Sequence, residues 1–366
     1  MRLEDLALQF TPGLGVKGVV HLLACFGDAG QIFQASAEEL IGRAELRAEV
    51  ARAVVERRGF AAAEAEVAYC RRHQITPLAS TDAAYPALLR EIPDYPHIIY
   101  VRGCVEALSK RCLSMVGTRE ATPYGQQLCN RFVGELAGRV PDLCIVSGLA
   151  FGIDVASHRA AIAERVPTVG VLANVLPGVM PTAHTQVARE ILDQGGALVT
   201  ELHSQTKQNG SFYLARNRII AGLSEGCIVV ESGAKGGSLV TAHYADSYNR
   251  CVMAPPGRIT DRTSSGTNHL LCNHKAEMIL SAEDIIRHLG WDLGENPVLV
   301  RPKAENPPLT KDEEGLLGCF RTSDPLPLEE LVELTGLNSG ELATLLLGLE
   351  LSGAIQQLPG NRYMRR

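Results

Sequence analysis

Between residues 111 and 257 the chain repeats one pattern, in which a short, continuous apolar run is followed by a helical stretch. The apolar runs cover 113–117, 143–148, 168–173, 197–202, 226–232 and 251–257, and the helical stretches lie near 124–138, 153–164, 183–194 and 237–248. A continuous apolar run predicts a strand buried on both faces, as in parallel sheets covered by crossover helices. We therefore expect an α/β fold with a doubly wound, mainly parallel sheet over residues 111–293.

The segment before this sheet is expected to form a separate helical domain. Residues 1–75 predict short helices, and a Gly-Leu-Gly turn at 13–15 separates the first two. Such a turn presents backbone N–H groups to DNA phosphates in helix-hairpin-helix modules, and it serves equally well in a small helical packing domain. Residues 76–110 contain four prolines that break any long helix, so we expect a connector that ends in a strand-like run at 97–103.

The segment after the sheet is expected to form a third domain. Residues 294–309 are rich in proline and polar groups and are typical of a linker. Residues 310–366 predict helices near 310–320, 326–336 and 339–353, followed by a hairpin with Pro359, Gly360 and Asn361 at its tip. Three helices and a hairpin are typical of a winged-helix domain. Because this segment is acidic, a role in protein contacts or dimer support is as well founded as DNA reading.

Composition limits the kinds of protein that this chain can be. Hydrophobic residues make up 46% of the chain, which supports a large folded core, whereas no apolar run reaches the ~20 residues of a membrane helix. The ten cysteines contain no CxxC pair, and no histidines have the spacing of a metal site. We therefore expect a reduced cytoplasmic protein without a metal, a cofactor or a membrane contact.

The charges are more informative in their distribution than in their sum. The net charge of −6 argues against a generally sticky nucleic-acid binder. Glu201 and Glu225, however, enclose a stretch without acids that contains Lys207, Arg216 and Arg218. A second stretch without acids, at 232–245, contains Lys235. An anion site is therefore expected in these two stretches.

Four predicted strand ends are rich in glycine or polar residues, and they cover 116–125, 146–154, 231–242 and 254–257. Ligands of parallel sheets bind at the carboxyl ends of the strands, where helix N-termini favour anions. These loops therefore predict a phosphate site. GxxxxGK[ST] and GxSxG are absent, and no GxGxxG follows a strand with a later acid, so ATP, NAD and a hydrolase serine are not expected. Asp154 and His158 have the spacing of a proton-transfer pair, and also of a structural hydrogen bond.

Six motifs, in their order along the chain, carry a resemblance to a known family. They are VGTRE, SGLAFGID, ARNRIIAGLS, ESGAKGGSLVTA, APPG and SSGTNHLL, and together they span about 110–285. This run resembles the DNA-processing protein A family, also called DprA or Smf. The resemblance implies an extended Rossmann-like fold that forms homodimers, binds single-stranded DNA and loads the RecA recombinase onto it during natural transformation. No enzymatic activity is implied.

The resemblance also implies site residues. Arg119 matches the arginine of the family's Gly-Ser-Arg loop, with Thr118 in place of serine. Arg216 and Arg218 match the arginines of its Arg-Asn-Arg element, and Tyr213 takes the place of the expected aromatic residue. The full set of candidate residues for single-stranded DNA binding is Gly117, Thr118, Arg119, Ser147, Gly148, Lys207, Phe212, Tyr213, Arg216, Asn217, Arg218, Lys235, Gly236, Gly237 and Ser238.

Two positions depart from the family pattern. Leu214 replaces a proline that often follows the aromatic residue, and Met180-Pro181 stands in the place of a Tyr-Pro pair.

Lys207 and Lys235 are included for their charge, which suits phosphate contacts. For the two arginines the alternative is that one of them pairs with Glu201 or Glu231 and holds the loop.

Two other functions compete with strand binding. A nucleotide phosphoribohydrolase would need a carboxylate behind its glycine-rich loop to stabilise a ribosyl cation, and Val240 and Thr241 occupy that place. A regulator specific for double-stranded DNA would need a basic recognition helix, and residues 338–353 contain no lysine or arginine. For the homodimer we expect an interface of two identical patches within 110–290.

Overall fold

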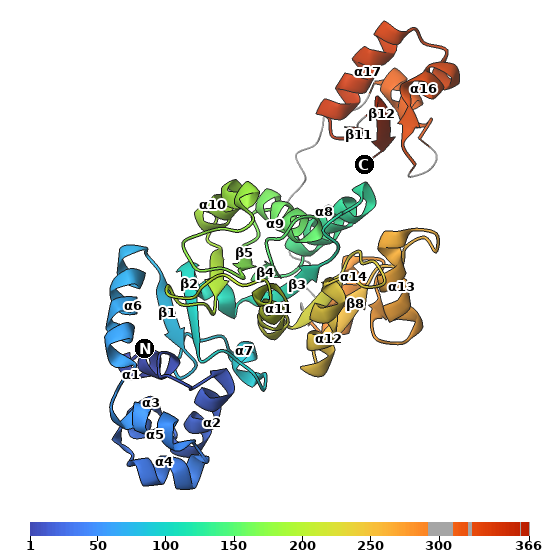
Figure 1. Ribbon diagram of the computed structural model, residues 1–366. Coiled ribbons are helices and arrows are strands. Elements are labelled where there is room, and N and C mark those ends of the chain that lie inside the picture. The colour runs from blue at the N-terminus through green and yellow to red at the C-terminus, as the bar shows by residue number, and fades with distance from the viewer. Residues whose placement is uncertain (292–309, 321–323, 359, 366) are drawn as a thin grey trace. The chain divides into compact units, whose positions relative to one another are not determined.

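The computed structural model describes residues 1–291, 310–320, 324–358 and 360–365. The chain divides into two units, residues 1–298 and 299–366, each with a hydrophobic core of its own (Figure 1). The linker expected at 294–309 lies outside the described residues, as does Pro359 of the predicted hairpin tip.

A nine-stranded sheet forms the centre of the first unit, with the strand order β1-β2-β6-β5-β4-β3-β7-β8-β9. Strands β3 to β9 pair in parallel, whereas β2 runs antiparallel to β6 and β1 antiparallel to β2. The predicted doubly wound, mainly parallel sheet is therefore confirmed. The strands are β1 (Thr76–Ala79), β2 (Ile98–Gly103), β3 (Arg111–Val116), β4 (Leu143–Ser147), β5 (Thr168–Val171), β6 (Ala197–Thr200), β7 (Gly226–Val229), β8 (Cys251–Ala254) and β9 (Glu277–Met278).

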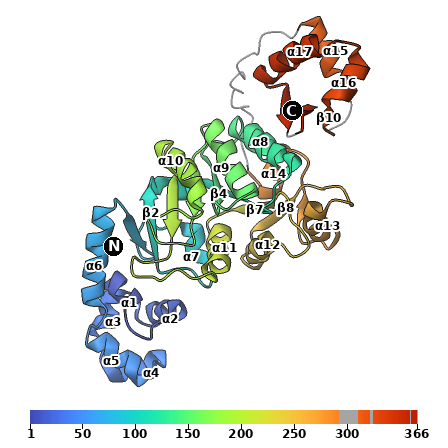
Figure 2. The same cartoon turned by 45° about the horizontal axis from the view of Figure 1, so that its top comes forward.

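Helices cover both faces of this sheet, as Figures 1 and 2 show. Strand β3 explains why, because its apolar residues alternate between two cores: Cys112 and Val116 face one, Leu113 and Met115 the other. The first face packs against α7 (Ala87–Glu91), α11 (Phe212–Gly222) and α12 (Ser238–Ser247). The opposite face packs against α8 (Pro123–Ala137), α9 (Ile153–Ala163), α10 (Thr185–Asp193) and α14 (Ala282–Leu289).

Four short elements complete the connections of this unit. They are the 3₁₀ turns η1 (Val105–Ser109), η2 (Thr182–His184) and η3 (Arg262–Ser264), and the helix α13 (Ser265–Cys272).

Residues 76–110 differ from their expected role as a connector, because they add β1 and β2 to the sheet. Pro77 lies in β1, at the edge of the sheet, where a strand tolerates a residue that donates no hydrogen bond. The prolines at 86, 93 and 96 lie at the ends of elements or in turns. They were correct evidence against a long helix but did not exclude edge strands.

Six helices precede the sheet, as the sequence predicts. They are α1 (Leu3–Gln9), α2 (Val16–Phe26), α3 (Ala29–Gln34), α4 (Ala37–Ala44), α5 (Ala48–Val55) and α6 (Phe60–Arg72). Their core is continuous with Tyr100 of β2 and Leu198 of β6. The Tyr100 hydroxyl donates to Oε1 of Gln9 at 2.7 Å, which fixes α1 against the sheet edge.

The second unit has the predicted winged-helix arrangement. Its helices are α15 (Lys311–Leu317), α16 (Leu328–Thr335) and α17 (Ser339–Leu351), and its sheet has the order β10-β12-β11. The strands are β10 (Leu326–Pro327), β11 (Ile355–Leu358) and β12 (Arg362–Arg365). A separate core that includes Leu316, Leu331, Leu346 and Ile355 holds these elements together.

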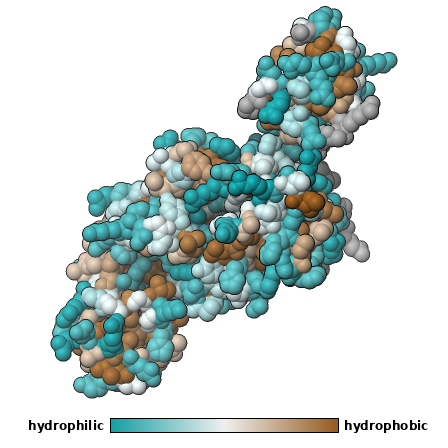
Figure 3. All heavy atoms as spheres, turned by 45° about the vertical axis from the view of Figure 1, so that its right-hand side comes forward, coloured by the Kyte–Doolittle hydropathy of each residue, from teal (hydrophilic) through white to brown (hydrophobic). Residues whose placement is uncertain are grey.

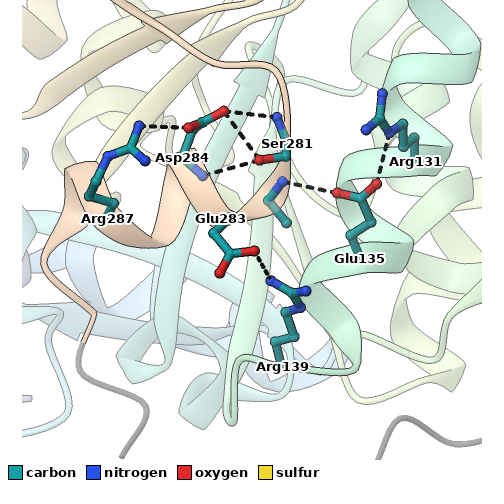
Figure 4. A network of polar contacts seen from close by, with 8 residues as sticks. Arg131, Glu135, Arg139, Ser281, Glu283, Asp284 and Arg287 are labelled. Atoms are coloured by element: carbon teal, nitrogen blue, oxygen red, sulfur yellow. Dashed lines mark hydrogen bonds and ion pairs between the residues drawn. The ribbon is translucent and has the colours of Figure 1, made fainter. Parts of the chain in front are cut away.

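A network of charged groups joins α14 to α8 on the surface of the first unit (Figure 4). The Asp284 carboxylate accepts from the backbone N–H groups of Leu280 and Ser281 at 2.8 and 3.1 Å and pairs with Arg287 at 2.6 Å. These contacts lower the pKa of Asp284 to about 2. Glu135 of α8 accepts from the backbone N–H of Ala282 at 3.0 Å, so the first turn of α14 is capped by its own chain and by its neighbour.

We expect Asp284→Ala to lower the free energy of unfolding by about 1 kcal/mol at pH 7, because it removes a helix cap. Since the folded pKa of Asp284 is depressed, its contribution is present above the unfolded pKa near 4 and is lost as the pH falls toward about 2. Urea unfolding at pH 7 and pH 3 measures both effects. The control is Glu283→Ala, which removes only an exposed ion pair to Arg139. Equal losses in the two variants, or a loss independent of pH, would contradict this assignment.

Candidate nucleic-acid interface

The predicted glycine-rich loops meet at one edge of the sheet. Strand β3 lies between β4 and β7, so the loops that follow these three parallel strands leave the sheet side by side. The chain reverses its strand order at β3, and ligands of doubly wound sheets bind at such a switch point. The loops concerned are 117–122, 148–152 and 230–237.

A carboxylate of the protein fills the anion position at this switch point. Glu231 is buried, and its side chain accepts from the backbone N–H and the hydroxyl of Thr122 at 2.9 and 2.5 Å. Thr122 is the N-cap of α8. A helix N-terminus in this place commonly binds the phosphate of a nucleotide. Here the N-terminus of α8 is already neutralised from within, which disfavours a nucleotide at this point.

Arg216 lies beneath the loops rather than on them. Its side chain is buried, and Nη1 donates to the carbonyl oxygens of Gly148, at 2.6 Å, and Val171. A side chain at position 148 would collide with this guanidinium group, so only glycine fits there. Burial raises the pKa of the nearby Asp154 carboxyl, and the positive charge of Arg216 opposes that shift. Arg216 therefore ties the ends of β4 and β5 together over a buried carboxyl group.

Arg218 is also buried, on the other side of α11. It donates to the Glu201 carboxylate at 2.5 Å and lies 3.7 Å from Asp94. This is the pairing with Glu201 that the sequence offered as an alternative to DNA binding. The two arginines of the Arg-Asn-Arg element thus both make internal contacts, and α11 buries them because its middle and last turns pack against the sheet.

Three other candidate cations reach solvent. Arg119, Lys207 and Lys235 are exposed and have no ion-pair partner among the residues that the structure describes. Arg119 lies in the loop after β3, and its guanidinium carbon is 5.8 Å from the centre of the Tyr213 ring, at the start of α11. An exposed cation and an aromatic face are therefore brought together from two distant parts of the sequence.

Several candidate residues shape the loops instead of reaching the surface. The hydroxyl of Ser147 donates to the Met115 carbonyl at 2.6 Å, and that of Ser238 donates to Oγ of Ser232 at 2.9 Å. Asn217 donates to the Gly237 carbonyl at 3.4 Å. Of the remaining candidates, Gly148 is buried, Gly117, Thr118, Phe212 and Gly236 are half-buried, and Gly237 is exposed.

Three further residues on this edge were not selected from the sequence. Phe151 follows β4 and is half exposed, and its ring centre lies 4.8 Å from that of His184. Tyr124, also partly exposed, donates to the Pro256 carbonyl at 3.1 Å. Arg262 is exposed. It lies beside the loop after β7, because the neighbouring Thr263 carbonyl accepts from the backbone N–H of Ser232. Their positions within or next to the glycine-rich motifs were the available signal.

His158 is structural. It is fully buried, its Nδ1 is 2.7 Å from Oγ1 of Thr168, and burial lowers its pKa to about 3, so it is neutral near pH 7. The sequence gave a structural hydrogen bond with Asp154 as the alternative to proton transfer, and the partner of His158 is instead Thr168. In the described parts of the chain no group of three or more His, Cys, Asp or Glu side chains is placed to hold a metal ion. No helix there is long and apolar enough to span a bilayer.

The profile of the DNA recombination-mediator protein A family matches residues 76–290, more than half of the chain. The chain belongs to this family. A second profile, the DprA winged helix domain, matches residues 300–361. The resemblance seen in the six sequence motifs is thereby confirmed, and the family profile includes β1 and β2 in the same domain as the rest of the sheet.

Relatives of the family cover most of the chain. Protein Smf of Escherichia coli is 35% identical over 80% of this chain and 77% of its own length. DNA processing protein DprA of Bacillus subtilis is 38% identical over 60% of this chain and 73% of its own length.

Two solved structures of the family are similar to this one. The DNA processing protein A of Streptococcus pneumoniae has a TM-score of 0.67 at 26% identity, over 78% of this chain and 98% of that one. That of Helicobacter pylori, described for its single-stranded DNA binding mode, has a TM-score of 0.53 at 28% identity, over 60% of this chain and 98% of that one.

The internal position of Arg216 predicts a loss of stability when it is replaced. Arg216→Met leaves the carbonyl groups of Gly148 and Val171 without their donor and removes the positive charge near the buried Asp154, and we expect a loss of about 1–3 kcal/mol in the free energy of unfolding for each unpaired acceptor. Adding Asp154→Asn should restore part of that loss. Urea unfolding of the wild type and the three variants measures this coupling. A variant of wild-type stability that binds DNA poorly would show instead that Arg216 contacts the strand directly.

Proposed function

We propose that this protein binds single-stranded DNA without catalysing a reaction, and loads the RecA recombinase onto it during natural transformation. The observation that carries the binding proposal is the contact of the exposed Arg119 with the partly exposed ring of Tyr213, with Lys207 and Lys235 on the loops after β6 and β7. Cations along a backbone track and aromatic faces for bases are what single-strand binders require. The single-stranded DNA binding of the Helicobacter pylori relative supports the same conclusion.

The internal carboxylates favour binding over catalysis. Glu231 is held by Thr122, and Asp154 is buried beside Arg216, so each acid has a structural partner. The alternative, a nucleotide phosphoribohydrolase, needs a carboxylate that faces its ligand beside the glycine-rich loop. Val240 and Thr241 occupy that place in α12. No observation in the structure favours the enzyme.

The surface of the site suits a polymer better than a small molecule. Arg119, Phe151, Lys207 and Lys235 lie on the loops after β3, β4, β6 and β7, and Tyr124 and Tyr213 lie in the first turns of α8 and α11, so the cations and rings are spread over several strand ends. Phe151 and Tyr124 extend the set of partly exposed rings beyond Tyr213. Each base that stacks on such a ring contributes about 1–3 kcal/mol to the free energy of binding, whatever the DNA sequence. Binding of this kind is strong, tolerant of sequence and sensitive to salt.

The experiment that tests this proposal replaces exposed cations only. We expect Arg119→Ala/Lys235→Ala to weaken binding to a labelled oligo(dT) by about tenfold or more at low salt. We also expect it to reduce the slope of log K against log salt by about 0.7 for each lost phosphate contact. Fluorescence anisotropy across a salt series measures both quantities.

The matched control is Arg159→Ala/Arg189→Ala, which removes two exposed arginines from α9 and α10 and changes the net charge equally. It should bind oligo(dT) within about twofold of the wild type, and a duplex of the same length should bind more weakly than the single strand. Equal losses in both double variants would mean that only net charge matters. Absence of single-strand binding at low salt would reject the proposal and direct attention to nucleotide hydrolysis.

The same proposal includes a homodimer and a cytoplasmic location. Ile259 is 96% exposed in the loop after β8, and Met278 and Leu280, at the free edge of β9, are more than half exposed. Exposed apolar side chains at and near an open sheet edge favour pairing with a second copy. Two copies would present two strand-binding edges to one DNA molecule and raise the effective affinity. The location rests on the ten cysteines, all of which are free.

Light scattering tests the dimer interface. We expect a dimer at micromolar concentration and a shift to monomer in Ile259→Lys/Leu280→Lys, because two buried lysines would repel their copies across the interface. The control Ile41→Lys/Val55→Lys places the same charges on exposed apolar positions of α4 and α5 and should remain a dimer. A strictly monomeric wild type would overturn this part of the proposal and leave the strand-binding part standing.

A further inference from the structure

The winged-helix unit contains an apolar groove that the proposed function does not use. It has a volume of about 650 Å³ and lies between α15, the end of α16 and the first half of α17. Leu316, Leu334, Leu337 and Leu345 supply its apolar lining. Leu334 is 56% exposed even though it belongs to a helix with a buried core face. On the face drawn in Figure 3, apolar residues of this unit reach the surface among hydrophilic ones.

The groove borders the helix-turn-helix, the part of a winged-helix domain that usually reads DNA. Helices α16 and α17 form a helix-turn-helix, and the N-terminal part of the second helix enters the major groove in DNA-reading members of this class. In this chain α17 (Ser339–Leu351) contains no lysine or arginine, and Glu341 lines the groove from its first turn. A duplex would bring its phosphates toward this acid without any compensating cation on the helix.

The charge of the unit is complementary to a cationic partner. Residues 310–366 contain nine acidic side chains and five basic ones, and none of the basic ones lies in α16 or α17. Asp312 and Glu341 lie at the groove itself, with Lys311 as a basic neighbour. Acids around an apolar floor disfavour nucleic acid and favour a ligand that is apolar on one side and basic at its margins.

We propose that this groove binds an amphipathic helix of a partner protein, with leucine-like residues in the groove and lysine or arginine at its rim. An apolar helix face in a hydrophobic groove, read at positions i, i+3, i+4 and i+7, is a recurrent mode of peptide recognition. The partner's cations pair with Asp312 and Glu341, and its apolar residues cover Leu334 and Leu345. The unit is thus a protein-docking module rather than a second DNA reader.

The test uses the full-length protein and a labelled peptide of about 14 residues, with leucines in the i, i+3, i+4, i+7 pattern and lysines elsewhere. An isomer of the same composition with broken spacing and a version with glutamates in place of lysines are the control peptides. Fluorescence anisotropy should show binding of the first peptide at least about tenfold tighter than of either control.

The chain offers a matched pair of variants for the groove. Leu334 and Leu347 are 56% and 57% exposed on neighbouring helices, and only Leu334 lines the groove. We expect Leu334→Gln to weaken peptide binding by about tenfold and Leu347→Gln to change it by less than about twofold. Asp312→Asn should weaken binding and reduce its salt dependence, whereas Glu329→Gln, in the first turn of α16 and outside the groove, should not.

Each outcome decides the matter. Equal binding of the two leucine-lysine isomers, equal effects of the two leucine variants, or no binding of the designed peptide would overturn the proposal. Competition by a DNA duplex that is lost in Leu334→Gln would identify the groove as a DNA site instead. Oligo(dT) binding by the same preparations should be unchanged in Leu334→Gln, which separates this result from the test of the strand-binding site. A urea-unfolding curve of Leu334→Gln that matches that of Leu347→Gln shows that the winged-helix unit is folded in both variants.

Discussion

The sheet edge that we propose binds a DNA strand depends on one buried arginine. Arg216 donates to carbonyl groups at the ends of β4 and β5 while its charge lies near the buried Asp154. A buried cation of this kind is stable only when acceptors surround it. Removal of one partner leaves the other buried, and its desolvation is then no longer compensated. The loops after the central strands can therefore carry glycines and exposed cations without losing their relative positions. The positions of the surface loops are thus set by a buried side chain, Arg216.

The same logic explains why this doubly wound sheet is suited to a polymer. In many such sheets the N-terminus of the helix at the switch point is left open for a phosphate. Here Glu231 neutralises the N-terminus of α8, and Asp154 lies in the first turn of α9. The N-termini of these two helices are thus already next to carboxylates of the protein itself. What remains for a ligand is the outer set of Arg119, Lys207, Lys235 and the exposed rings, which suits an extended phosphate backbone.

The sequence predicted the sheet well because a strand buried on both faces needs a continuous apolar run, which requires no knowledge of its neighbours. It predicted the strand-like run at 97–103 that forms β2. It did not predict β1, since the prolines of 76–110 suggest a connector unless the edge position of β1 is known. The site was harder still. Arg119 and Arg216 are the same residue type in the sequence. Arg119 is exposed on a loop, whereas Arg216 is buried because α11 packs against the sheet. The acceptors of Arg216, at Gly148 and Val171, are distant in sequence, so no local pattern reports them.

The acidity of the winged-helix unit avoids a competition between two nucleic-acid ligands. If the protein binds single-stranded DNA through cations on its central sheet, as proposed, it gains little from a second domain that attracts duplex DNA nonspecifically, since duplex is a competing polyanion. A helix-turn-helix whose second helix lacks cations and carries Glu341 repels phosphate while keeping its fold through the core around Leu331 and Leu346. The winged-helix fold is thus compatible with the different ligand that we propose for it. Charge on the reading face, rather than the architecture, decides which macromolecule such a unit accepts.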